Sequence, residues 1–412
     1  MQGLHVHNEI GTLKSVLLHR PGFETKSYPE NAFGQVFTLR PNRSNFDLDK
    51  ATQEHERLVS ILEANGVEVL LLTDLLEETL TSSSEAREAL LDRFCDECGV
   101  RGSELKRSVR AWIEQKAAGG SLIDALIGSI CYGDIFKQVK GDDRLANLVD
   151  DPYPADALLV NPFSTMFFTR DPASVIGSTL SLNHMYWSDR EREVAFYQVI
   201  FSHHPRFAGC SVAPEEPSSY HIEGGDVVNL DARNVAVGLS QRTEAAAIDV
   251  LARRLLWSEN SEIESVWAVR VPEDNLCIHL DTFLSRADVE TFIVDPELLD
   301  HAEIYRIVRG RKKGTCRIKS LDGGVSALLK QSLGISAPTL ISCGGSMSER
   351  RHNAASVLAL APGKVCVYEE NKLTNEALYR AGIDLFPVSI DELTSGYGGP
   401  SCLCLPLWRE DC

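Results

Sequence analysis

A cysteine close to the C-terminal end of the chain belongs to a segment suited to covalent chemistry. Cys402 follows the glycine-rich segment 395–401, and Cys404 is the nearest rival thiol. A thiolate is a strong nucleophile, and a nearby imidazole can carry protons for it. The glycines leave room for a substrate to reach Cys402, whereas Cys404 lacks adjacent glycines. We therefore predict that Cys402 is the nucleophile of a hydrolase and keep Cys404 as the alternative.

Two upstream segments contain the acids and the base that such a thiol needs. His279 and Asp281 flank Leu280, so in a strand the two polar side chains would share one face. This spacing predicts a proton shuttle beside a cation-binding carboxylate. A core histidine with an acidic neighbour is the alternative.

The tetrapeptide Glu223-Gly224-Gly225-Asp226 is the second of these segments. Paired glycines permit a close backbone approach or a positive φ, so a strand end can present two carboxylates, Glu223 and Asp226, at a pocket. A tight turn with solvated acids is the alternative. Asp171 lies in segment 161–172, which we interpret as a strand that ends at a pocket, or else as an ion pair with Arg170.

The composition limits the partners of the protein. The 412 residues include 41 basic and 59 acidic side chains, a net charge of −18. This charge argues against nucleic acid and anionic membranes and modestly favours a small cationic or zwitterionic substrate. No apolar stretch approaches the roughly 18–20 residues of a spanning helix, and the first residues do not resemble a secretory signal. We therefore expect a cytoplasmic protein.

Hydrophobic periodicity predicts an α/β fold in which a strand-strand-helix-strand unit recurs. We predict that residues 1–412 form a single catalytic domain and that residues 75–148 form an all-helical insertion within it. The main predicted strands are 13–20 (ended by a Pro-Gly turn), 67–72, 157–160, 227–230, 235–239, 266–271, 291–294 and 365–368. The main predicted helices are 51–64, 86–98, 103–118, 121–132, 243–256 and 371–381.

Together these segments resemble the arginine deiminases, members of the guanidino-modifying superfamily. The resemblance spans nearly the whole chain and includes, in order, Glu9-Ile10-Gly11, segment 15–22, Glu54-His55, segment 65–70, Phe168-Thr169-Arg170-Asp171-Pro172, Glu223-Gly224-Gly225-Asp226, His279-Leu280-Asp281-Thr282, Ala361-Pro362-Gly363 and segment 402–411. It implies the pentein fold, a propeller of five ββαβ blades.

The resemblance also implies roles for individual residues. Cys402 would attack the guanidinium carbon, and His279 would act as general acid and then as general base. Asp171, Asp281 and Glu223 would surround the guanidinium group. Arg190 and Arg242 match arginines that bind the substrate carboxylate, although a surface salt bridge is the commoner fate of an arginine. No cofactor or metal is required.

Several positions depart from the family pattern in loops that would frame the pocket. Thr165 replaces the usual asparagine, Tyr397 replaces a frequent arginine, and segments 34–39 and 353–356 also differ. The reaction that we predict is hydrolysis of L-arginine to L-citrulline and ammonia. The alternatives are deimination of another guanidino compound, citrulline ureido-hydrolysis and amidino transfer. The sequence does not determine the oligomeric state, and a homo-oligomer is one of the alternatives.

Overall fold

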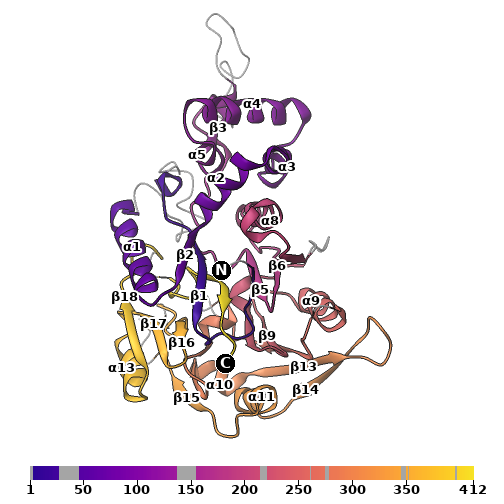
Figure 1. The fold of residues 1–412 in the computed structure, drawn as a ribbon, viewed down its shortest axis with the longest axis vertical. Coiled ribbons are helices and arrows are strands. Elements are labelled where there is room, and N and C mark those ends of the chain that lie inside the picture. The colour runs from indigo at the N-terminus through magenta and orange to yellow at the C-terminus, as the bar shows by residue number, and fades with distance from the viewer. Residues whose placement is uncertain are drawn as a thin grey trace, which may run out of the picture.

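The protein has an α/β structure assembled from small sheets and the helices beside them (Figure 1). The computed structural model describes residues 3–26, 46–136, 155–213, 220–259, 261–273, 278–344, 349–350, 352–394 and 397–412. Within these residues the strands form one five-stranded sheet, four three-stranded sheets and one two-stranded sheet. The predicted fold class is thus confirmed at the level of α/β.

One pairing pattern recurs in five of the sheets, namely an antiparallel pair of strands followed by a parallel neighbour. The strands, in sets of three, are β5 (Ala173–Ile176), β6 (Thr179–Leu182) and β7 (Ser211–Ala213); β8 (Val227–Asp231), β9 (Asn234–Leu239) and β10 (Ser265–Arg270); β11 (Leu284–Arg286), β12 (Thr291–Val294) and β15 (Thr339–Ser342); β16 (Leu358–Ala361), β17 (Lys364–Tyr368) and β18 (Asp384–Val388); and β19 (Leu405–Arg409), β1 (Leu13–Leu18) and β2 (Glu68–Leu71). The recurring strand-strand-helix-strand unit predicted from the sequence is confirmed.

Each parallel strand follows its neighbour through a crossover that contains helical structure, as parallel pairing requires. The crossover helices are α1 (Leu48–Ala64), α7 (Ser188–Glu191), α8 (Val194–His203), α9 (Ala245–Trp257), α10 (Pro296–His301), α11 (Gly324–Leu333) and α13 (Lys372–Arg380). The second sheet is extended by β13 (Glu303–Arg309) and β14 (Cys316–Leu321).

The sheet that contains β1 joins the two ends of the chain. Strand β1 pairs antiparallel with β19 and parallel with β2, so the N and C labels lie close together in Figure 1. Because β19 begins at Leu405, this pairing also fixes the segment that contains Cys402.

A group of helices follows β2 and projects from the top of the molecule in Figure 1. Buried Leu76, Leu90 and Phe94 pack in one cluster with Phe196 of α8, which attaches these helices to the sheets. Part of the predicted insertion, residues 137–148, lies outside the described residues, as does segment 34–39. The elements are α2 (Leu72–Ser82), α3 (Ser84–Glu97), α4 (Ser103–Gly119), α5 (Leu122–Ile127), α6 (Tyr132–Ile135) and the strand β3 (Ile130–Cys131), which pairs with β4 (Leu158–Val160).

Three local predictions are wrong. The helix predicted over residues 121–132 ends at Ile127, and residues 130–131 form strand β3 instead. Residues 161–172 form turns rather than a strand, with the Phe168 amide bonded to the Thr165 carbonyl, and strand β5 starts only after Pro172. The segment after His279 is a 3-10 turn, Leu280–Thr282, because the Thr282 amide and hydroxyl both donate to the His279 carbonyl. A threonine hydroxyl that bonds a nearby carbonyl competes with the strand ladder.

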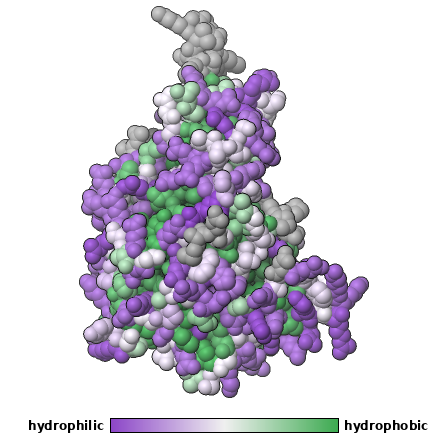
Figure 2. Space-filling model, in the orientation of Figure 1, coloured by the Kyte–Doolittle hydropathy of each residue, from purple (hydrophilic) through white to green (hydrophobic). Residues whose placement is uncertain are grey.

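The surface is largely polar. Figure 2 shows hydrophilic residues over much of the visible face, including the β13–β14 hairpin at the lower right, where strand β14 exposes most of its side chains. Among the described residues, no helix is both long and apolar enough to cross a membrane.

A buried arginine ties the two ends of the chain to a neighbouring sheet. The Arg409 side chain donates to the carbonyl oxygens of Gly11 and Ala359 at 2.9 and 2.8 Å. Burial lowers the pKa of Arg409 to about 10, and the charge of Glu9 opposes that shift. Glu9 also accepts a hydrogen bond from Arg170, so three buried charges depend on one another.

We expect Arg409→Met to lower the free energy of unfolding by about 3 kcal/mol, because it leaves the carbonyl oxygens of Gly11 and Ala359 without their donor. Urea denaturation measures this loss. The matched control is Arg380→Met, which breaks the exposed i,i+4 pair with Glu376 and should change stability by less than about 1 kcal/mol. Equal effects of the two variants would contradict the structural role of Arg409.

Candidate active site

Cys402 lies in a buried turn directly before β19. Its amide donates to the Gly399 carbonyl at 3.1 Å, and its sulfur lies 3.3 Å from the Ser356 hydroxyl. A Cβ on Gly399 would stand 2.1 Å from the Ser356 carbonyl oxygen, so only glycine permits this approach. The sequence identified Ser356 as a departure from the family pattern and did not reveal its contact with the thiol.

The environments of Cys402 and Cys404 differ. Burial raises the pKa of the Cys402 thiol, and the negative charges of Asp281 and Asp171 raise it further, so this thiol is protonated in the free protein. Cys404 instead packs in an apolar cluster with Cys366 and Leu13. Only the Cys402 sulfur therefore lies among acids that a bound cation would neutralise.

His279 is held between two carboxylates. Its Nε2 atom lies 2.7 Å from Oε2 of Glu223, and its Nδ1 atom lies 3.8 Å from Oδ1 of Asp171. Burial disfavours the imidazolium, but the charge of Asp171 and the hydrogen bond to Glu223 outweigh it and raise the pKa of His279 to about 9. At neutral pH the side chain is thus a cation and can act as a general acid.

Glu223 is the anionic partner of this histidine. Burial works to raise the pKa of Glu223, but the hydrogen bond with His279 prevails and lowers it to about 2. The other carboxylate oxygen of Glu223 accepts the Tyr186 amide at 3.0 Å, so the acid is satisfied on both sides. A fully bonded carboxylate fixes the orientation of the imidazole.

The glycines and Asp226 position the Glu223 segment. The Gly224 amide donates to the Asp171 carbonyl at 2.9 Å, which joins two acidic segments. Asp226 accepts the Leu280 amide at 2.8 Å and the Ser240 hydroxyl at 2.6 Å, and burial raises its pKa to about 6. Asp226 therefore holds the backbone beside His279. Its place in the tetrapeptide was the only sequence signal for this role.

The two carboxylate oxygens of Asp281 differ in their hydrogen bonding. Its Oδ2 accepts the Ser401 hydroxyl at 3.2 Å, which connects Asp281 to the residue before Cys402. Within the described part of the chain, its buried Oδ1 has no hydrogen-bond partner. Burial raises the pKa of Asp281 to about 7 despite the opposing charge of His279. A buried, unpaired acceptor is costly and is suited to receive a ligand donor.

Arg190 is buried and bonded inside the protein. It donates to Asp171 Oδ2 at 2.7 Å, to both oxygens of Glu193, and to the Phe168 carbonyl. These bonds use four of the five donors of a guanidinium group. Glu193, which the sequence did not single out, also accepts the Thr165 hydroxyl at 3.2 Å. The assignment of Arg190 to the substrate carboxylate stays a prediction.

Arg242 also lies beside Glu223 and makes fewer side-chain interactions inside the protein than Arg190 does. Its Nη1 is 3.7 Å from Glu223 Oε2, and its guanidinium group lies over the rings of Tyr186 and Trp187 at 5.4 and 5.6 Å. Cation–π contacts of this kind orient an arginine without using its donors. Its role as a carboxylate ligand likewise stays a prediction.

Asp171, Glu223 and His279 each offer a ligand atom within 4.8 Å of the others. The two histidine nitrogens face different carboxylates, and Arg190 already pairs with Asp171. The arrangement is therefore better described as a network of ion pairs than as a metal site.

The predicted catalytic residues thus converge from four segments of the chain. Asp171 and Glu223 contact His279, whereas Asp281 contacts the turn that contains Cys402. The Arg170 amide donates to the Cys402 carbonyl, and the Thr169 hydroxyl donates to the Leu403 carbonyl. A buried thiol, an imidazolium and three carboxylates characterise a site for a cationic substrate.

Solved structures define the class of fold. The chain is similar to SxtG, an amidinotransferase from Microseira wollei, with a TM-score of 0.57 and 17% identity over 99% of this chain and 98% of that one. It is also similar to DDAH from Pseudomonas aeruginosa in complex with citrulline, with a TM-score of 0.52 and 13% identity over 96% and 99% of the two chains. At these identities the likeness shows the fold, which is of the pentein type.

The sequence comparisons are more specific. The arginine deiminase family model matches residues 44–409. Arginine deiminase from Treponema denticola is 33% identical over 421 residues, covering 100% of both chains, and that from Clostridium perfringens is 33% identical over 428 residues, covering 100% of this chain and 99% of that one. This protein belongs to the arginine deiminase family.

The space beside His279 can be tested at Gly225. A Cβ at this position would lie 2.6 Å from Nδ1 of His279, so Gly225→Ala should displace the imidazole from its position between Glu223 and Asp171. We expect a loss of about 1–3 kcal/mol in the free energy of unfolding and a lower pKa of His279. Urea denaturation and an NMR titration of the His279 ring measure the two effects.

Gly119→Ala is the matched control, because its Cβ would meet nothing within 4 Å. It lies at the end of α4 and should leave stability unchanged or raise it by up to about 1 kcal/mol. A Gly225→Ala protein with wild-type stability and an unchanged His279 titration would refute the proposed close approach.

Proposed function

We propose that the protein hydrolyses the guanidino group of L-arginine to give L-citrulline and ammonia. The observation that carries this proposal is the set of acids around Cys402 and His279, together with the unpaired Oδ1 of Asp281. Membership of the arginine deiminase family supports it.

The proposed binding step pairs the guanidinium cation with the carboxylates. A guanidinium group has several N–H donors in one plane and needs several acceptors. Oδ1 of Asp281 is available, and Oδ1 of Asp171 faces the site while its Oδ2 is held by Arg190. Each charged hydrogen bond contributes roughly 1.5–3 kcal/mol, which is enough for two acids to orient the group.

Binding of a cation also activates the nucleophile in this proposal. Burial and two nearby negative charges keep Cys402 protonated in the free protein. A guanidinium beside the sulfur offsets those charges and favours the thiolate, and the thiol proton leaves to solvent. The substrate thus promotes the ionisation of the group that attacks it.

The proposed chemistry has two halves. In the first, the Cys402 thiolate bonds to the guanidinium carbon, the imidazolium of His279 donates a proton to one amino group, and the C–N bond breaks to release ammonia. The remaining amidino group stays on sulfur as a thiouronium cation. In the second, neutral His279 removes a proton from water, the hydroxide adds to the carbon, and the C–S bond breaks. Loss of the hydroxyl proton then gives the ureido group and restores the thiolate.

A second candidate substrate class is a guanidino compound without a free α-carboxylate. The observation that favours it is the internal pairing of Arg190, which has one donor left and would have to release Asp171 or Glu193 to bind a carboxylate with two hydrogen bonds. Arg242 then stays as the arginine with donors to spare, next to the aromatic rings of Tyr186 and Trp187.

We further propose that the five similar sheets are the five blades of a propeller and that residues 1–412 form one catalytic domain with residues 75–148 as an insertion. The recurring pairing pattern supports the first point. We propose a cytoplasmic location, which is supported by the free thiols of Cys95, Cys366 and Cys404. A homo-oligomer is also part of this proposal.

Ammonia release from a substrate panel tests the proposed function. The panel contains L-arginine, arginine methyl ester, agmatine, a peptidyl arginine, guanidino acids and citrulline, with no added amine. Release from L-arginine supports the main proposal, and release only from carboxylate-free compounds supports the second candidate. Release from citrulline would indicate ureido hydrolysis. No release until an amine is added would indicate amidino transfer.

The nucleophile can be distinguished from its neighbour by matched variants. We expect Cys402→Ser to reduce kcat by about a thousandfold or more, because a serine hydroxyl in this site lacks a base placed to activate it. Cys404→Ser changes an equally buried thiol of the apolar core and should retain most of the activity. Steady-state ammonia release measures both variants. If Cys404→Ser reduced kcat more than Cys402→Ser did, the assignment of Cys402 as the nucleophile would be wrong.

The pH dependence of kcat/KM follows from three of the perturbed groups. Asp281 must be ionised to accept a guanidinium N–H, and its pKa is about 7, so activity should rise as pH increases through that value. His279 must be protonated to act as an acid, and its pKa is about 9, so loss of its proton opposes any further gain as pH increases past that value. Because ionisation of Cys402 on substrate binding also releases a proton, we expect kcat/KM to rise from pH 6 and to level off near pH 9. A profile that falls steadily from pH 6 to 9 would contradict the assignment.

A further inference from the structure

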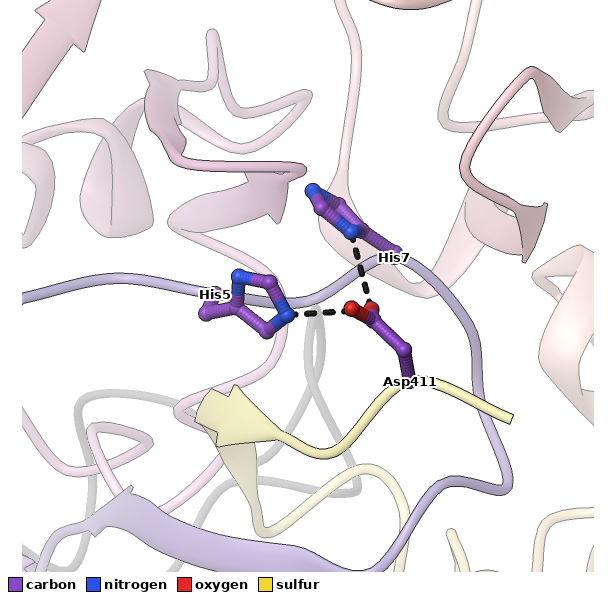
Figure 3. Close-up of side chains that lie close together, drawn as sticks. All are labelled: His5, His7 and Asp411. Carbon is purple, nitrogen blue, oxygen red and sulfur yellow. Dashed lines mark hydrogen bonds and ion pairs between the residues drawn. The ribbon is translucent and has the colours of Figure 1, made fainter.

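Two histidines from the start of the chain and an aspartate from its end meet outside the active site (Figure 3). His5 Nε2 and His7 Nδ1 each lie 3.0 Å from Oδ1 of Asp411. The ligand atoms of all three residues lie within 4.8 Å of one another. The sequence analysis identified no metal-ligand cluster, because some 400 residues separate these side chains along the chain.

The backbone holds the histidine segment in place. The His5 amide donates to the Leu407 carbonyl at 2.9 Å, and the His5 carbonyl accepts the Arg409 amide at 2.7 Å. Val6 exchanges two further hydrogen bonds with Gly177. Because the segment is extended between these contacts, residues 5 and 7 share one face. The positions of both imidazoles are therefore set by main-chain pairing before any ligand binds.

The aspartate segment is fixed in a similar way. The Glu410 amide donates to the Thr12 carbonyl at 3.0 Å, and Asn8 donates to the Glu410 carbonyl at 3.2 Å. The His5 ring also stacks on Trp408 with a centroid distance of 5.1 Å. Asp411 itself is about two-thirds exposed, so solvent and ions reach its carboxylate.

The distances fit a tetrahedral ion. Bonds of about 2.0–2.1 Å from zinc to nitrogen or oxygen place neighbouring ligand atoms about 3.3 Å apart. The two nitrogen-to-oxygen distances to Asp411, both 3.0 Å, differ from that edge by only a few tenths of an ångström. Two imidazoles and one carboxylate are a donor set suited to zinc and related first-row ions.

We propose that His5, His7 and Asp411 bind a divalent transition-metal ion such as Zn²⁺, with water completing its coordination. The ion takes the place of the hydrogen bonds that now join each imidazole to the carboxylate. It connects the segment before β1 to the segment after β19. Its effect is therefore to clamp the two ends of the chain together, away from the substrate.

Calorimetric titration with Zn²⁺ of the chelator-treated, full-length protein without a histidine tag tests this proposal. We expect one site in the wild type and in Cys412→Ser, which removes the exposed thiol next to Asp411. The double variant His5→Ala/His7→Ala should lose affinity by more than the roughly 10- to 100-fold that removal of an outer partner costs. Asp411→Asn, a substitution at an exposed side chain, should weaken binding without disturbing the fold.

Three further measurements distinguish zinc binding at His5, His7 and Asp411 from zinc binding elsewhere on the protein. His279→Ala removes the other His/Asp/Glu group and should keep the site, as should His203→Ala, which changes a histidine on α8. The melting temperature should rise with Zn²⁺ in the wild type and not in the double variant, since an ion that binds only the folded state stabilises it. Equal affinity in the wild type and the double variant, or loss of the site in His279→Ala, would overturn the proposal.

Discussion

The pairing of His279 with Glu223 in a buried pocket is the interaction on which the rest of the site depends. An isolated charge in such a place would be neutralised by proton transfer, so each charged group needs a partner. Glu223 provides it for His279, Arg190 provides it for Asp171, and Glu193 balances Arg190. The chain of partners explains why so many ionisable side chains tolerate burial here. It also fixes the imidazole, because neither carboxylate beside it is free to turn.

The fold meets this requirement by bringing together residues that lie far apart in the sequence. Asp171 precedes β5, Glu223 precedes β8, His279 and Asp281 precede β11, and Cys402 precedes β19, so each functional segment leads into the first strand of a sheet. Main-chain bonds then connect the segments directly, from Gly224 to Asp171 and from Arg170 to Cys402. Repetition of one sheet unit therefore places chemically different residues at equivalent points. Loss of a single connection would move a charged group away from its partner.

The sequence predicted most strands and helices because buried strands and amphipathic helices have strong periodic patterns. It failed at residues 161–172 and 280–282, where side-chain and turn hydrogen bonds override local preference. The candidate catalytic set could be named because each of its residues stands in a recognisable motif. Ser356 and Glu193 were not assigned roles, since their importance lies in contacts with distant segments. The His5, His7 and Asp411 cluster was invisible for the same reason, as only strand pairing joins its parts.

The electrostatics of the free site also explain how the protein would bind a cation in preference to a neutral ligand. Asp281 and Cys402 both lose a proton less readily than usual, because burial and neighbouring negative charge disfavour a further anion. A bound guanidinium reverses that penalty for both groups at once, so their ionisation and cation binding favour one another by linkage. A neutral ligand of the same shape would leave the thiol protonated and Asp281 partly neutral. Selectivity for charge is thereby coupled to activation of the nucleophile, and a ligand that fails to bring a positive charge fails to generate the thiolate.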